Sequence, residues 1–135
     1  MEDQSLSKTE ETIAAQLNFQ ALAKEVSEIP GVLSCTIINS DGAIKGRIIG
    51  YVPHSDEVLD KAGKIGSAIW GGLKILEPEA GPLNAVIVSY EKFRVYGVPI
   101  PGTRICVMAA VKLSVDPFEF CNRIAYFVQY FMGNK

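Results

Sequence analysis

The sequence has no long hydrophobic run, only one histidine, and no surplus of basic residues. Its apolar runs are far shorter than the roughly 20 residues that a helix needs to cross a bilayer, so we expect no direct membrane insertion. The net charge of -2 argues against broad nucleic-acid binding, which needs an excess of Lys and Arg. The acidic, polar start differs from the basic start of a signal peptide, which favours a cytoplasmic location.

The residues that could carry chemistry form no recognisable catalytic or metal-binding pattern. Cys35, Cys106 and Cys121 stand far apart within apolar segments, which indicates buried, reduced thiols and not a disulfide framework. The single histidine, His54, has no Ser, Cys or acid pattern around it that would make it a base. The segment 63–67 lacks the spacing of a phosphate-binding loop. We therefore expect no enzyme activity, no cofactor and no metal.

The length of 135 residues and the hydrophobic content of 48% are those of one globular domain, in which residues 1–8 are expected to form a flexible tail. Ser7 and Glu10 have the spacing of a capping box, which predicts a helix start. An apolar stripe follows at helical spacing, and it consists of Ala15, Phe19, Leu22, Val26 and Ile29. Pro30-Gly31 then predicts the end of this helix.

A β-hairpin is predicted next. The segment 32–39 is rich in β-branched residues, and Asp41-Gly42 separates it from a second such segment, 43–51. Asp-Gly between two strand-like segments is a strong hairpin signal, because Gly accepts the positive φ of the turn. Gly46 and Gly50 in the second segment indicate a bulge or the close approach of another backbone.

A second helix is predicted from Pro53–Glu57 to about Lys74. Its apolar stripe consists of Val58, Ala62, Ile65, Ile69 and Leu73. Beside that stripe, Gly63, Ser67 and Gly71 stand four residues apart and form a ridge of small residues. Glycine weakens a helix by about 1 kcal/mol relative to alanine, so the ridge suggests that another backbone lies close to it. That backbone belongs either to the protein's own sheet or to the same helix of a second copy.

Three strand-like segments, 84–90, 93–99 and 103–112, follow with short spacers and predict an antiparallel meander. The last of them is apolar on both faces, so it should lie centrally, covered by helices above and below. Asp116-Pro117-Phe118-Glu119 predicts the start of a closing helix. Tyr126 and Tyr130 on that helix are interpreted either as a solvent-edge pair or as part of a partner-binding patch.

This order of elements, together with Ile29-Pro30-Gly31-Val32 and the Asp41-Gly42 turn, resembles the Roadblock family of dynein light chains and small-GTPase regulators. The resemblance covers about residues 12–131. It implies an α+β fold of the profilin-like order α-β-β-α-β-β-β-α. A five-stranded antiparallel sheet would carry the middle helix on one face and the two terminal helices on the other.

The resemblance also implies a dimer, formed by pairing of the third strands and of the middle helices. The partner would be a second copy or a paralogous Roadblock protein. The residues expected at this interface are Gly63, Ser67, Trp70, Gly71, Ala85, Val86, Ile87 and Val88.

A Ras-like small GTPase is the further partner that the resemblance implies, and a chain without a catalytic set suits an adaptor or regulator. Asp60, Lys61 and Lys64 are the contact residues expected on the outward side of the middle helix. The alternative is a ligand-sensing or actin-binding module with a profilin-like fold. A pocket lined by Trp70 or Tyr126 would favour sensing, and a flat helical face would favour the adaptor.

Overall fold

The computed structural model describes residues 18–49 and 56–133, and its order of elements agrees with the order expected from the sequence except for two short helical segments, η1 and α4, after α3. The first half contains α2 (Phe19–Ser27), β1 (Val32–Asn39), β2 (Ile44–Ile49) and α3 (Asp56–Leu73). The second half contains the 3-10 turn η1 (Lys74–Leu76), α4 (Glu77–Ala80), β3 (Val86–Ser89), β4 (Arg94–Pro99), β5 (Ile105–Val111) and α5 (Pro117–Gly133). The expected tail, the Ser7–Glu10 capping box, Gly50 and His54 lie outside the described residues.

The five strands form one antiparallel sheet in the order β2-β1-β5-β4-β3. β5 lies in the centre and pairs with β1 on one side and β4 on the other. Its side chains are mostly buried, as expected for a strand that is apolar on both faces. β2 and β3 are the two edges of the sheet.

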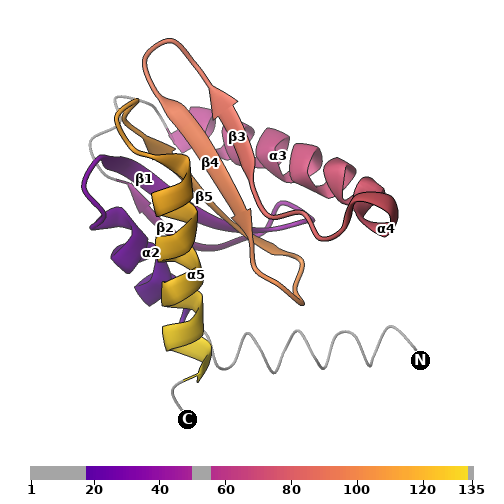
Figure 1. Cartoon of the computed structure of the whole chain (residues 1–135). Coiled ribbons are helices and arrows are strands. Elements are labelled where there is room, and N and C mark those ends of the chain that lie inside the picture. The colour runs from indigo at the N-terminus through magenta and orange to yellow at the C-terminus, as the bar shows by residue number, and fades with distance from the viewer. Residues whose placement is uncertain (1–17, 50–55, 134–135) are drawn as a thin grey trace.

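Helices cover both faces of this sheet (Figure 1). α2 and α5 lie together on one face, where Leu22, Val26, Phe120 and Ile124 share the larger apolar core. α3 lies on the other face, where Trp70 packs with residues of β1 and β5 in a smaller core. The expected fold class is therefore confirmed. Within the described part of the chain, no helix is long and apolar enough to span a membrane.

Local sequence signals explain where the helices of the first face begin. The side chain of Asn18 accepts a hydrogen bond from the Ala21 amide and so caps α2. The carboxylate of Asp116 accepts one from the Glu119 amide at the start of α5. After η1 the chain forms the short helix α4, in which Pro78 falls in the first turn, where its missing N–H costs no hydrogen bond.

Candidate interaction surface

Helix α3 is attached to the sheet by its small residues and by its tryptophan. Ser67 is only 3% exposed, and the single hydrogen of its hydroxyl is shared between the backbone oxygens of Ser40 and Asn39, which lie 2.9 and 3.1 Å from its Oγ. Gly66 lies against Met108 so closely that a Cβ atom there would collide with the methionine side chain. Trp70 is 1% exposed. The sequence left open whether the small residues of α3 pack on the protein's own sheet or on a second copy. For Ser67, the structure shows packing on the protein's own sheet.

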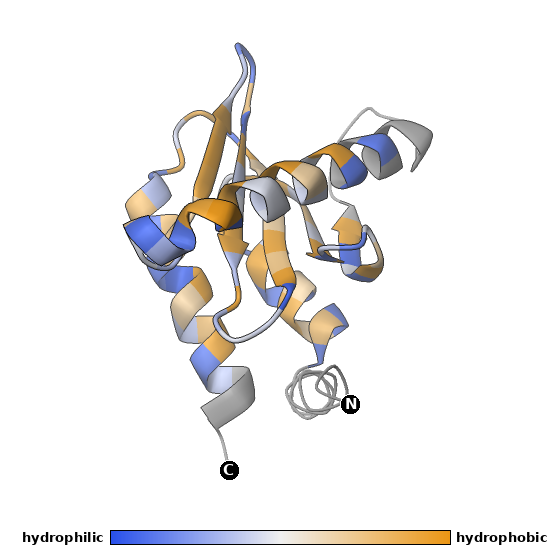
Figure 2. Ribbon diagram, turned by 90° about the vertical axis from the view of Figure 1, so that its right-hand side faces the viewer, coloured by the Kyte–Doolittle hydropathy of each residue, from blue (hydrophilic) through white to orange (hydrophobic). Residues whose placement is uncertain are grey.

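The described part of the apolar stripe of α3 is largely exposed, although Ile69 also borders the sheet beside Val86 and Val88. Ile65, Ile69 and Leu73 are 61%, 43% and 39% exposed, and Ile75 and Leu76 in η1 continue the exposed apolar surface. In Figure 2, α3 crosses in front of the sheet, and no described element covers it. Exposed apolar patches on folded domains are typical of surfaces that contact another protein, a membrane or a ligand. We call Ile65, Ile69, Leu73, Ile75 and Leu76 the α3 patch.

The glycines near the end of α3 and the predicted charged contacts lie around this patch. A Cβ atom at Gly71 or Gly72 would meet nothing within 4 Å, so this side of the helix is open to a close approach. Lys61 and Lys64 are exposed, and the stem of Lys64 lies beside Gly42 of the β1–β2 turn. The side chain of Asp60 and the surroundings of Gly63 lie outside what the structure describes.

The edge strand β3 is held next to α3 by the connection between them. The ammonium group of Lys74 lies 5.2 Å from the ring centre of Trp70 and 3.9 Å from a carboxylate oxygen of Glu77. The other oxygen of Glu77 accepts a hydrogen bond of 2.7 Å from the Leu83 amide, just before β3. The end of α3 and the start of β3 are thus tied together.

The predicted edge residues Ala85, Val86, Ile87 and Val88 lie on or next to β3. Val86 and Val88 are half-buried and face α3, whereas Ile87 is exposed on the opposite face. Their place in a dimer, like that of Gly63, Ser67, Trp70 and Gly71, stays a prediction. The structure places Val86 and Val88 beside α3, so the helix and the edge form one surface.

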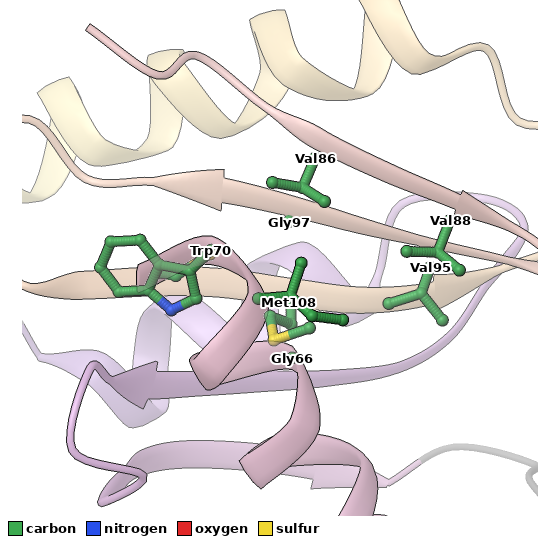
Figure 3. A pocket seen from close by; sticks show the side chains of 9 residues that line it. Gly66, Trp70, Val86, Val88, Val95, Gly97 and Met108 are labelled. Atoms are coloured by element: carbon green, nitrogen blue, oxygen red, sulfur yellow. The ribbon is translucent and has the colours of Figure 1, made fainter. Parts of the chain in front are cut away.

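A shallow apolar pocket lies between α3 and the sheet. Figure 3 shows Trp70 at one end, Val88 and Val95 at the other, and Met108 between them beside Gly66. The pocket is lined by Trp70, which would favour a sensor, but its volume is only about 20 Å³. Sites for small ligands usually measure roughly 300–1,000 Å³. Its size therefore does not favour metabolite sensing.

The residues on the other face are separate from the α3 patch. Tyr126 and Tyr130 are exposed on α5, which lies across the sheet from α3. On the face of α2 and α5, Cys35 is buried and Cys121 is half-buried, whereas Cys106 is buried on the α3 face beside Trp70; each is a free thiol. No cluster of three or more His, Cys, Asp or Glu residues that could hold a metal occurs in the described ranges.

The sequence alone did not show that Ile65, Ile69 and Leu73 face outward. A stripe at helical spacing shows that a helix has an apolar side, but not whether that side meets the sheet or a partner. The signal that could have shown this direction lies on the opposite side of the same helix. Gly66, Ser67 and Trp70 lie together there, and small residues beside one large aromatic suit a helix that packs closely on a sheet.

Comparison with solved structures finds this arrangement in Roadblock/LC7 proteins. A Roadblock/LC7 domain from Streptomyces avermitilis matches with a TM-score of 0.68 at 14% identity, over 84% of this chain and 94% of that one. The MglB protein of Myxococcus xanthus matches with a TM-score of 0.67 at 13% identity, over 84% and 91% of the two chains. The gliding protein MglB from Thermus thermophilus matches with a TM-score of 0.66 at 9% identity, over 85% and 88%.

The chain therefore has the Roadblock/LC7 fold, which confirms the resemblance inferred from the sequence at the level of the fold. Two of these structural neighbours are MglB proteins. No protein-family model matches the sequence, and no curated protein matches it significantly. At such low identities the likeness concerns the backbone arrangement, and the partner has to be argued from this chain's own surface.

Proposed function

We propose that this protein is a non-catalytic, homodimeric adaptor or regulator that binds a Ras-like small GTPase or scaffolds a protein complex. The observation that carries the proposal is the α3 patch, an exposed apolar helix face continuous with the edge strand β3. A surface that contains both an apolar helix and an open strand edge can pair with its own copy about a two-fold axis. The Roadblock/LC7 fold supports this use of the surface.

In the proposed dimer, the residues predicted from the sequence have three different places. Gly71 and residues 85–88, which lie on or just before β3, are near the axis together with the α3 patch. Ser67 and Trp70 hold α3 against the sheet from behind, so that Ile65, Ile69 and Leu73 remain outside. Gly63 continues the helix toward its start.

The dimer is tested with two matched substitutions. Ile69 and Leu113 are similarly exposed, at 43% and 44%, but Ile69 belongs to the α3 patch and Leu113 follows β5. We expect Ile69→Asp to be a monomer in sedimentation velocity at tens of micromolar, because a buried unpaired carboxylate is costly. Wild type and Leu113→Asp should both be dimers. A monomeric wild type would contradict the proposed dimer.

Binding to a GTPase is tested by a pull-down from an extract of the cells that produce this protein. We expect a Ras-like GTPase to be recovered. Asp60, Lys61 and Lys64 are the proposed contacts, since they lie on α3 near the patch. Reversing all three charges should reduce the recovery of the GTPase at least about tenfold, because charge complementarity sets much of the specificity of such contacts. Unchanged recovery would remove these residues from the interface.

The same surface argues against the ligand-sensing alternative. The pocket beside Trp70 is small and almost wholly apolar, so it offers few groups that could orient a metabolite. Thermal stabilisation by any member of a metabolite panel would revive that alternative, because a ligand that binds only the folded state raises its stability.

A further inference from the structure

The outer edge of β2 is occupied by a side chain of the protein itself. The side-chain amide of Gln20, on α2, makes two hydrogen bonds with the backbone of Arg47. Its Nε2 donates to the Arg47 oxygen at 3.1 Å, and its Oε1 accepts from the Arg47 amide at 3.0 Å. Arg47 itself lies opposite Thr36 of β1. The Gln20 amide therefore bonds to β2 as the backbone of a neighbouring strand would, with one donated and one accepted hydrogen bond.

The backbone of β2 is shaped to let α2 come this close. A Cβ atom at Gly46 would lie 2.7 Å from the Phe19 oxygen and 3.1 Å from the Gln20 nitrogen. The pairing of β1 with β2 also shifts register next to this point, between Ile37 and Ile38. The close approach of another backbone, which the sequence suggested for Gly46, is confirmed, and it places the Gln20 side chain at the edge.

Among the residues that the structure describes, no side chain covers the opposite edge of the sheet in this way. β3 pairs with β4 along its whole length, from Val86 to Ser89. In the described part of the chain, none of the assigned side-chain hydrogen bonds ends on the backbone of residues 86–89. Within residues 18–49 and 56–133 the two edges thus differ: β2 is closed at Arg47 by an amide from α2, whereas no described side chain bonds to the outer edge of β3.

We propose that Gln20 closes the β2 edge against strand addition by a second copy of this chain, so that assembly is limited to the β3 side. An edge strand with unpaired N–H and C=O groups is a template for another strand. With two open edges, each copy could bond two neighbours, and the sheet would grow without closing. The proposal concerns β2 and does not depend on whether the copies pair through β3.

Amide hydrogen exchange tests the contact directly. In wild type, the Arg47 amide is bonded to Gln20 and should exchange slowly for an edge position. In Gln20→Met, which keeps the length of the side chain but removes donor and acceptor, the Arg47 amide should exchange about tenfold faster. The matched control is Gln129→Met, at an exposed glutamine of α5. Equal exchange at Arg47 in wild type and Gln20→Met would overturn the proposal.

Sedimentation velocity tests the consequence for assembly. Gln20→Met and Gly46→Ala disturb the contact from its two sides, and both should form concentration-dependent species larger than those of wild type and Gln129→Met. If wild type is a monomer, the proposed β3 dimer fails, yet the two variants should still associate through β2. If the variants never exceed the wild-type size, even though the Arg47 amide is exposed, Gln20 does not guard this edge and the proposal is wrong.

Discussion

The three thiols differ in how deeply they lie. Burial raises the pKa of Cys35 to about 12, and the neighbouring Cys106 adds to this effect. Burial also raises the pKa of Cys106 to about 12, against a smaller lowering by a backbone hydrogen bond and Lys74. Cys121 is half-buried, and burial is the main cause of its raised pKa. The reactive thiolate is therefore scarce at all three positions near neutral pH.

Thiol labelling at pH 8 should separate these positions. In the native protein we expect slow labelling of Cys121 alone, and in denaturant rapid labelling of all three thiols. Cys121→Ser should then show almost no labelling in the native state. Labelling of Cys35 or Cys106 in the folded protein at the rate of Cys121 would contradict their assigned burial.

The same pKa values predict how stability depends on pH. An unfolded thiol ionises near its ordinary pKa of 9.0, whereas the folded Cys35 and Cys106 stay protonated until about pH 12. Because the unfolded state loses its protons first, this contribution to stability is complete below pH 9 and is lost between pH 9 and 12. Urea unfolding of wild type should therefore show a decline in this range, and Cys35→Ala should show a smaller one.

Ser67 is the residue whose hydroxyl fixes α3 to the β1–β2 turn. Ser67→Ala would remove the one hydroxyl hydrogen that the backbone oxygens of Asn39 and Ser40 share, and we expect a loss of about 1–2 kcal/mol in the free energy of unfolding. The exposed Ser114 is the matched control, and Ser114→Ala should change stability by less than about 0.5 kcal/mol. Equal effects of the two substitutions in urea titrations would remove the anchoring role of Ser67.

At the scale of elements, the start of α5 can be read directly from the sequence. Asp116 caps the helix, and Pro117 fills its first position. Asp116→Ala should lower the free energy of unfolding by about 1 kcal/mol, as cap removal usually does. Asn122→Ala, at an exposed position within the same helix, should cost less, and a larger loss there would mean that the cap is not what stabilises α5.

Most helices and strands could be predicted because neighbouring residues in the sequence determine where each one begins or ends. The Asp41-Gly42 turn, where Gly42 has a φ of 93°, and the apolar segment 105–111 define strands whatever the rest of the chain does. The outward direction of the α3 patch and the Gln20–Arg47 pairing could not be predicted in this way. Each depends on two elements that meet only in the folded chain, and residues 20 and 47 carry no local signal of that meeting.

At the scale of the whole molecule, dimerisation should be visible in thermal stability. If only the folded state pairs through the α3 patch, the unfolding midpoint should rise with protein concentration by mass action. We expect an increase of a few degrees between about 1 and 100 µM for wild type, and none for the monomeric Ile69→Asp. A concentration-independent midpoint for wild type would mean that the patch does not pair in this range.

The central place of β5 affects how the chain is made in the cell. β1 and β2 leave the ribosome early, but the strand that joins them to the rest of the sheet is the last one synthesised, since Ile37 pairs with Val107. Until then β1 has a free edge and its apolar side chains lack their cover. Translation thus produces an incomplete sheet for several seconds, and a chaperone that holds apolar strands would find its substrate in that interval.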